Sequence, residues 1–335
     1  MLHAWMKGNL GDVLQLSVLV SALRELQPRT LDLAGYPAQP AEETAEVLRV
    51  ADRYLPDPFP RYWTFTPGPL AAALVEPLWR RRRRALFARY DAVVCAPGPY
   101  LAEYDPRAVS ALCDIDVAAG MGLPVVLASH SIGPLGDAGL AVVSRAAAVV
   151  AREPATHQYL RARGVSAVAS ADFAFLYPYP RGEEPPVAPP YRLLFLRSNN
   201  LRADRLRLDR GALFEGSRPI AEAGDAPFVL ATSDRRRDAR FLARASRALG
   251  VRAVGCRSVA ELSRLIEGSA GVISDRYHPA ICAAVLGRPA RVLSNREPHK
   301  MQGLQDLLAA GRVGELQAHA RAGLDAVRAA LRESV

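Results

Sequence analysis

Residues 178–190 read PYPRGEEPPVAPP and separate two stretches of chain that follow the same pattern. Six prolines, one glycine and three charged residues in thirteen positions cannot sustain a helix or a central strand, so we predict an extended linker. On either side of it, short apolar runs alternate with longer amphipathic runs, which is typical of parallel sheets connected by helices. The sequence therefore predicts an α/β fold with two doubly wound, Rossmann-like domains facing each other across a cleft.

The linker sets the predicted domain boundaries. The first domain is expected over residues 1–178, the linker over 179–190 and the second domain over 191–312. A helix over residues 313–335 closes the chain, and packing back on the first domain is one arrangement open to it.

Apolar runs predict the strands, and amphipathic runs predict the helices between them. In the first half, strands are expected at residues 3–6, 92–96, 125–129 and 147–151, with a weaker one at 174–176, and a helix at 13–26. In the second half, strands at 193–197, 228–231, 252–255, 272–274 and 291–293 alternate with helices at 238–249, 259–266 and 279–286. Helical sequence at 301–310 and 314–331 follows.

Charge and cysteine usage limit the partners and the compartment. Lys and Arg outnumber Asp and Glu by 43 to 34, a formal net charge of +9, which favours anionic partners without choosing among them. The four cysteines are widely spaced, which favours reduced, buried thiols and a cytoplasmic protein. The start of the chain lacks a signal peptide's apolar core, and no 18-residue apolar run predicts a membrane span. No Cys/His cluster has metal-ligand spacing.

The stretch SDRYHPAICAAVLGRPA at 274–290 places Arg276 and His278 where an apolar strand gives way to a helix. Pro279 suits the first turn of that helix, because its missing N–H would have no partner there. A helix start offers unpaired N–H groups and partial positive charge, and an added arginine makes it a receptor for an anion. A structural reading stays open for both residues, with Arg276 pairing and His278 capping the helix.

Three glycine-bearing turns also fall where predicted strands end, and in open α/β sheets ligands bind at such ends. In KGNLGD at 7–12, Asp12 is expected to cap a helix that starts at Val13. In CAPGPYL at 95–101, Gly98 would let the backbone approach a ligand. In SHSIGPL at 129–135, three successive amides are candidates for an anion nest. Each stretch can equally be a plain turn.

The chain resembles the polysaccharide pyruvyl transferase family over most of its length. The resemblance rests on GNLGD at 8–12, APGPYL at 96–101, SIGP at 131–134, AREPATHQYLRARGV at 151–165 and ADFAFL at 171–176. SDRYHPAICAAVLGRPA is similar to the family's serine-any-arginine-any-histidine motif, the most specific match, and HKMQGL at 299–304 to its lysine-glycine-leucine element. The chain departs from the pattern at its start, where the first strand is short and the expected glycines before GNLGD are absent.

Family members transfer pyruvate from phosphoenolpyruvate to a sugar as a cyclic ketal, with a fold similar to glycosyltransferase B. Phosphoenolpyruvate carries a phosphate and a carboxylate and needs at least two cationic contacts. Ketal formation moves protons near neutral pH, where imidazole titrates, so His278 is expected to be the general acid/base. The expected donor-binding residues are Arg276, Arg152, Lys300, Ser131 and Gly133, and the expected acceptor or cleft residues are Asn9, Asp12, Gly98 and Tyr100. No metal or cofactor is expected, with phosphoenolpyruvate as co-substrate.

Other activities remain open at this point. One is a nucleotide-sugar transferase with the same two-domain architecture. Such an enzyme usually has a carboxylate near the cleft, for the ribose or as the general base, whereas this motif concentrates cations. Another is a non-catalytic relative that binds a phosphorylated glycan or lipid.

Two basic stretches suggest anionic partners. Residues 69–90, PLAAALVEPLWRRRRRALFARY, join apolar residues to five arginines, so peripheral contact of Leu70–Arg84 with an anionic membrane is one interpretation. The other is an amphipathic helix packed on the first domain with its arginines in water. Residues 196–211, LRSNNLRADRLRLDRG, are expected to form a basic loop that contacts an anionic acceptor or is merely solvated. Nucleic acid is not an expected partner, because aromatics are not interleaved with these charges.

Overall fold

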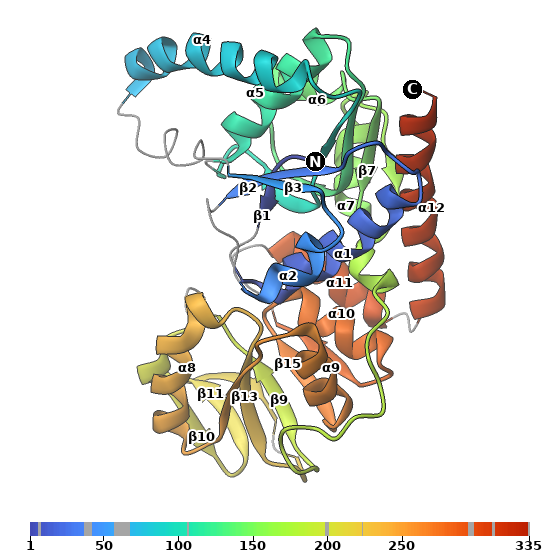
Figure 1. Ribbon diagram of the computed structural model, residues 1–335. Helices are drawn as coiled ribbons and strands as arrows, with labels where there is room; N and C mark the ends of the chain where they lie inside the picture. Colours follow the sequence, from blue (N-terminus) through green and yellow to red (C-terminus); the bar gives the residue numbers. More distant parts are fainter. Residues whose placement is uncertain are drawn as a thin grey trace. The chain divides into compact units, whose positions relative to one another are not determined.

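The computed structural model describes residues 1–5, 8–36, 42–56, 68–105, 107–197, 201–222, 224–293, 298–309 and 312–333. Its contacts divide the chain into two compact units (Figure 1). Unit 1 comprises Met1–Lys7, Gln15–Leu176 and Leu316–Val335, and unit 2 comprises Gly8–Leu14 and Tyr177–Glu315. The segment Gly8–Leu14 therefore groups with the second unit, whereas the sequence places it in the first domain.

Parallel strands form the centre of unit 1. One sheet has the order β1-β2-β3, and the other has the order β4-β6-β7-β8 with β5 paired to β6. A parallel bridge from Leu2 to Cys95 links the two sheets. The strands are β1 Ala4–Trp5, β2 Asp32–Tyr36, β3 Arg53–Pro56, β4 Val93–Cys95, β5 Gly98–Leu101, β6 Val125–Ile132, β7 Ala148–Ala151 and β8 Val168–Ala169.

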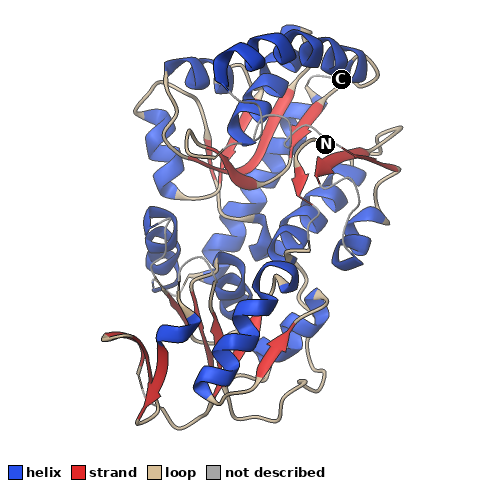
Figure 2. Ribbon diagram, turned by 90° about the vertical axis from the view of Figure 1, so that its left-hand side faces the viewer, coloured by secondary structure: helices blue, strands red, loops and turns tan. Residues whose placement is uncertain are grey.

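Helices border the strands of unit 1, as Figure 2 shows. They are α1 Leu10–Arg24, α2 Ala45–Leu48, α4 Gly68–Phe87, α5 Arg107–Gly120, α6 Asp137–Val143, α7 Pro154–Arg161 and α12 Val313–Arg332, with 3-10 turns η1 Glu42–Thr44 and η2 Phe173–Leu176. The C-terminal helix α12 packs on this unit, where Gly323 approaches Ser170 and the backbone carbonyl of His319 accepts a hydrogen bond from the Ser170 hydroxyl. Alternating residues of β6, among them Val125 and Leu127, lie in the apolar core with Ile115 of α5.

Unit 2 has a single parallel sheet of order β14-β13-β9-β15-β16. Its strands are β9 Arg192–Phe195, β13 Phe228–Thr232, β14 Ala253–Gly255, β15 Gly271–Ser274 and β16 Ala290–Val292. The first strand of the unit, β9, lies in the middle, with β13 on one side and β15 on the other. This order makes the junction of β9 and β15 the point where the direction of winding reverses.

Local signals in the sequence explain the helix boundaries of unit 2. Helix α8, Arg235–Leu249, begins after Asp234, whose carboxylate accepts a hydrogen bond from the Arg237 amide (3.2 Å). The helix is followed by Gly250, which has a φ of 65°. Helix α9, Val259–Glu267, begins with the Ser258 hydroxyl accepting the Glu261 amide (3.1 Å). Helices α10, Tyr277–Val285, and α11, Pro298–Ala309, follow. No helix or strand interrupts residues 177–191, the region of the predicted linker.

Two predicted elements take another form. Residues 174–176 form the 3-10 turn η2, because the Asp172 carboxylate accepts the Ala174 amide (2.8 Å) and bends the chain. The described part of the basic stretch contains 3-10 turn η3, Ala203–Arg205, and strand β10, Leu206–Asp209. That strand joins β11 Ala212–Glu215 and β12 Arg218–Ala221 in an antiparallel sheet, in place of the expected loop.

Candidate functional site

The predicted Arg276–His278 motif lies at the carboxyl end of β15 in unit 2. Strand β15 ends at Ser274, whose hydroxyl accepts the Arg276 amide (2.9 Å) and donates to the Arg276 carbonyl (2.8 Å). These two bonds close a tight turn that leads directly into α10. Arg276 thus occupies the position just before the helix, and His278 lies in its first turn.

Arg276 is buried, with 5 % of its surface exposed, and its guanidinium forms an ion pair with Asp238 of α8. Asp238 is also buried and accepts a hydrogen bond from the Thr232 hydroxyl (3.1 Å). Burial, and then the nearby positive charges of Arg197 and Arg237, lower the pKa of Arg276 to about 9. A buried cation among other cations gains from a bound anion, which restores favourable charge interactions.

The N-terminal GNLGD segment packs against His278, although the two are far apart in the sequence. A β-carbon added to Gly11 would lie 2.6 Å from Cγ of His278 and closer still to Nδ1. The Leu10 amide donates to the carbonyl of Ser233 (2.9 Å), directly after β13, and anchors the segment to unit 2. The absence of a side chain at position 11 is therefore what makes room for the imidazole.

Asn9 and Asp12 lie in this segment beside the motif. The Asn9 carbonyl oxygen Oδ1 accepts the Gly11 amide (3.2 Å), and its Nδ2 donates to the Asp12 carboxylate (3.1 Å). Helix α1 begins at Leu10, so Asn9 precedes the helix and Asp12 lies in its first turn. The prediction that Asp12 caps a helix starting at Val13 is wrong, because the helix starts three residues earlier. The Asp12 charge instead acts on Arg276, whose pKa it raises against the dominant effect of burial.

Arg152 is fully buried within unit 1, at the end of β7. Its guanidinium donates to Asp172 (3.0 Å), to Gln15 (3.2 Å) and to the Ser131 hydroxyl (2.7 Å), and Glu153 lies 3.3 Å from its Nε. Asp172 is also fully buried. These contacts give Arg152 a structural task in unit 1, and its contact with a donor stays a prediction.

Ser131 lies in the last part of strand β6, Gly133 directly follows the strand, and the two do not form the predicted nest. The Ile132 amide between them donates to the Thr156 hydroxyl (3.1 Å), and the Gly133 amide donates to the Leu101 carbonyl (2.9 Å). Two of the three amides are thus used within the protein. The donor-binding roles of Ser131 and Gly133 stay predictions that would have to use other atoms.

Gly98 and Tyr100 lie on β5, which pairs with β6. Tyr100 is buried, and its hydroxyl donates a hydrogen bond to the Ala96 carbonyl (2.7 Å). Nε2 of His130 lies 2.9 Å from the Tyr100 hydroxyl oxygen. A β-carbon at Gly98 would lie 2.8 Å from the Tyr100 ring, so this glycine makes room for the tyrosine. The burial of Tyr100 argues against direct contact between its hydroxyl and an acceptor.

Two histidines of unit 1, the buried His130 and the 11 % exposed His3, predict a loss of stability in acid. Burial, followed by the positive charge of Arg152, lowers the pKa of His130 to about 3, and burial lowers that of His3 to about 3. Between pH 6.5 and 3 the unfolded chain binds protons that the folded unit does not, which removes up to ~1.4 kcal/mol of stability per pH unit and histidine. Melting temperatures between pH 7 and pH 4.5 should fall more steeply for the parent protein than for His130→Gln. Equal slopes would contradict the neutral, buried state of His130.

Helix α4 carries the arginine run Arg80–Arg84. Arg83 is buried and pairs with Asp114 of α5 (2.8 and 2.9 Å), and its guanidinium lies over the Trp79 ring. Arg80 pairs with Asp116 (2.6 Å). The interpretation that all five arginines are in water is therefore wrong for Arg83. Arg81, Arg82 and Arg84 are exposed, as is 58 % of Leu78.

Other predicted residues are less informative. Lys300 lies on α11, but its side chain is outside the described part of the chain, as is that of Leu70. In the basic stretch, Arg202 pairs with Asp204 (2.8 Å) and Arg207 with Asp209 (3.1 Å), so part of its charge is neutralised locally.

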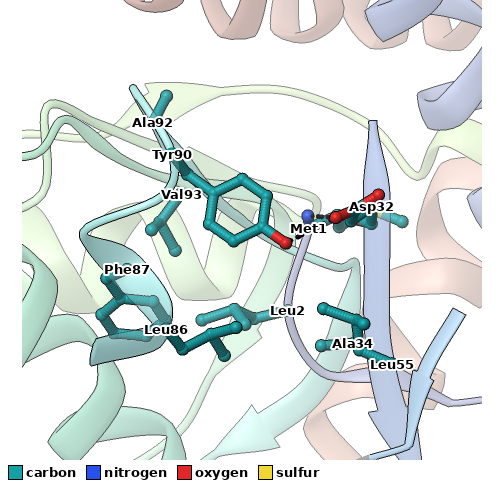
Figure 3. Close-up of a pocket in the computed structure, with 10 residues that line it drawn as sticks. All are labelled: Met1, Leu2, Asp32, Ala34, Leu55, Leu86, Phe87, Tyr90, Ala92 and Val93. Carbon is teal, nitrogen blue, oxygen red and sulfur yellow. Dashed lines mark hydrogen bonds between the residues drawn. The ribbon is translucent and has the colours of Figure 1, made fainter. Parts of the chain in front are cut away.

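A small pocket in unit 1 lies between the N-terminus and helix α4 (Figure 3). Its cavity of about 30 Å³ is lined by apolar side chains such as Leu55 and Phe87, with Tyr90 donating to the Asp32 carboxylate (2.5 Å) at its edge. A water needs ~10–15 Å³, so the cavity has room for a water or two and not for a sugar or phosphoenolpyruvate. It is not a substrate site.

Within the described ranges, no helix has the length and apolar character needed to cross a membrane. Among the same residues, no group of three or more His, Cys, Asp or Glu side chains is arranged to hold a metal ion.

Asp238 and Arg197 are not among the site residues predicted from the sequence. Asp238 sits on the amphipathic helix α8, where no local pattern indicates that its carboxylate meets Arg276. Arg197 follows strand β9 as Arg276 follows β15, so the rule that ligands bind at strand ends could have identified it.

Comparison with known proteins gives a family and a fold. The model of the family described as polysaccharide pyruvyl transferase matches residues 9–297. No curated protein matches the sequence. Among solved structures, UDP-GlcNAc 2-epimerase from Methanocaldococcus jannaschii in complex with UDP-GlcNAc and UDP has a TM-score of 0.56 at 11% identity, covering 98% of each chain.

Two further structures are similar. The S. aureus MnaA–UDP structure has a TM-score of 0.55 at 12% identity, covering 95% of this chain and 91% of that one. UDP-GlcNAc 2-epimerase from Neisseria meningitidis bound to UDP-GlcNAc has a TM-score of 0.52 at 10% identity, covering 99% of this chain and 100% of that one. At such low identity these structures establish the fold alone, which is α/β and glycosyltransferase-B-like.

Proposed function

The chain belongs to the polysaccharide pyruvyl transferase family, and from that premise we propose that it moves the pyruvyl group of phosphoenolpyruvate onto a sugar or glycan-like acceptor. The product would be a cyclic ketal, with release of phosphate. The proposal makes His278 the catalytic acid/base and Arg276 a donor-binding residue.

The observation that supports this proposal best is the packing of Gly11 against the His278 imidazole in unit 2. It brings together two segments of the family match that lie more than 260 positions apart in the sequence. The same place holds a buried arginine at the start of a helix. Cation, helix start and imidazole are the groups that a doubly charged enol ester needs.

The proposed reaction needs protons to move at defined points. His278 would give a proton to the methylene carbon of phosphoenolpyruvate, which becomes a methyl group and leaves the neighbouring carbon electron-deficient. A sugar hydroxyl attacks that carbon and loses its proton, and the C–O bond to phosphate breaks. A second hydroxyl then attacks the same carbon, loses its proton and closes the ketal. Arg276 would hold and neutralise the anionic donor through these steps.

Incubation with phosphoenolpyruvate and candidate acceptors tests this function. We expect phosphate release together with an acceptor mass increased by one pyruvate less one water. The similarity to epimerase structures bound to UDP-GlcNAc makes nucleotide sugars the competing ligands. If UDP-GlcNAc raises the melting temperature and phosphoenolpyruvate does not, a nucleotide-sugar transferase replaces the proposal, because a ligand stabilises the state it binds.

Gly11→Ala is expected to reduce turnover without unfolding the protein. The added β-carbon would overlap the His278 ring, so the imidazole must move, and small displacements of a catalytic group cost about 100-fold in rate. Steady-state kcat and the melting temperature should be measured together. Gly314→Ala is the matched control, because no atom lies within 4 Å of its added carbon. A Gly11→Ala protein with parental kcat would contradict the role of this contact.

The remaining parts of the proposal concern location and acceptor. All four cysteines are buried and unpaired, which supports a reducing compartment and hence a cytoplasmic reaction. Exposed Leu78 and the exposed arginines of α4 support peripheral contact with an anionic membrane. The acceptor would then be a soluble or lipid-linked glycan.

A further inference from the structure

Unit 2 contains one position where the geometry of the sheet favours a ligand. The order β14-β13-β9-β15-β16 places β9 and β15 side by side (Figure 1). The neighbour of β9 on its other side is β13, and the neighbour of β15 on its other side is β16, so the sheet extends from this pair in opposite directions. In open α/β sheets, ligands bind outside the carboxyl ends of the strands at this reversal.

An arginine stands at the carboxyl end of each of these two strands. Ser274 of β15 lies opposite Phe195 of β9, and the Asp275 amide donates to the Phe195 carbonyl (3.0 Å). Arg197 and Arg276 each follow their strand by two residues, and the two side chains are close enough that the positive charge of Arg197 helps to lower the pKa of Arg276. The Asp275 carboxylate accepts the Arg197 backbone amide (3.0 Å) and holds the two strand ends together.

The two arginines have donor groups that the described residues do not satisfy. Nε of Arg276 is buried and has no hydrogen-bond partner among them. The Arg197 guanidinium, on a half-buried residue, has no ion pair or hydrogen bond with any described residue. A buried unsatisfied donor is costly and calls for a partner that binds there.

The acidic groups nearby are already used by the fold. Asp275 binds the Arg197 amide, Asp234 caps α8 and lies 3.8 Å from Arg237, and Asp12 accepts from Asn9. Asp238 pairs with Arg276 through the other end of the guanidinium and leaves Nε unsatisfied. The donors that remain are cationic, and the start of α10 adds backbone N–H groups.

We propose that Arg197 and Arg276 together bind the phosphate group of the donor at the junction of β9 and β15. Arg197 supplies a guanidinium from the strand end, and Arg276 supplies its buried Nε beside the first turn of α10. This inference rests on the proposed function for the identity of the donor, although the site itself requires only a phosphate.

Isothermal titration calorimetry tests the site by measuring how tightly the full chain binds inorganic phosphate and phosphoenolpyruvate. Arg197→Gln is expected to lower the affinity for both ligands by at least about tenfold, because a charge-assisted hydrogen bond contributes this much to binding. Arg197→Lys keeps the charge but loses the planar guanidinium, so its phosphate affinity should lie between those of the parent protein and Arg197→Gln. Arg202→Gln removes an equal charge from a 62 % exposed residue paired with Asp204 and should bind as the parent does.

The outcomes separate this inference from the proposed function. If folded Arg197→Gln binds phosphate as tightly as the parent protein does, the role of Arg197 is overturned and the proposed pyruvyl transfer is unaffected. If the glutamine variant does not fold, the same result with Arg197→Lys has the same meaning. A parent protein that binds no phosphate at millimolar concentration also overturns the site. If the parent binds phosphate through Arg197 but neither binds phosphoenolpyruvate nor forms a ketal, the site stands and the proposed function falls.

Discussion

His278→Ala is expected to lower kcat by about 100- to 10,000-fold, the contribution typical of a general acid/base. The affinity for phosphoenolpyruvate should be nearly unchanged, because the charges that bind the donor remain. The half-buried ring lies in the first turn of α10 and packs against Gly11, two positions after Arg276, and the proposed function makes it the group that protonates the bound enol. Phosphate release and donor binding measured on the same preparation separate these two effects.

His319→Ala is the matched control, because that histidine is exposed on α12 of unit 1. It should retain parental kcat and melting temperature. A His278→Ala protein with parental turnover would remove His278 from the chemistry. Loss of both turnover and donor binding would make His278 a binding residue instead.

Asp172→Ala is expected to destabilise unit 1 by about 3–5 kcal/mol, the cost of removing one partner of a buried ion pair. Arg152 and Asp172 are both fully buried, 3.0 Å apart, and Asp172 also holds the Ala174 amide. Removal of the Asp172 carboxylate would leave a guanidinium in the interior without this charged partner, although Glu153 stays 3.3 Å from its Nε. Thermal unfolding followed by circular dichroism should show a decrease on the order of 10 °C.

Asp325→Ala provides the comparison within the same unit. Asp325 also meets an arginine, Arg328, at 3.1 Å, but 69 % of its side chain is exposed. Its removal should change stability by less than about 0.5 kcal/mol. Equal effects of the two substitutions would contradict the structural role assigned to Arg152.

The strands and helices that the sequence predicts correctly share a strong local signal. Buried strands such as β6 and β13 begin with four consecutive apolar residues, VVLA and FVLA, and α9 begins with a serine cap and ends before a glycine. Strands β2 and β3 lack such runs. Their sequences, DLAGY and RYLP, place charge and glycine among the apolar residues, and their pairing with β1 and with each other identifies them only in three dimensions.

The antiparallel sheet of unit 2 could have been found. Residues 206–209 alternate apolar and charged side chains, Gly211 follows with φ of 80°, and residues 212–215 pair back in register. The density of arginines instead favours the prediction of a basic loop that contacts an anionic acceptor or is solvated. The Arg207 guanidinium instead lies over the Phe214 ring, which shows that a charged side chain can cover the face of a small sheet.

The sequence by itself determined the α/β class and the position of Arg276 and His278 at a strand end, because periodicity and helix starts are local properties. Only the tertiary structure decided that Gly8–Leu14 joins unit 2, that Gly11 makes room for the imidazole and that Asp238 pairs with Arg276. It also decided that Arg152 and Tyr100 are buried. Contacts of this kind join distant positions of the chain, and they depend on how apolar faces pack together, which no local pattern specifies.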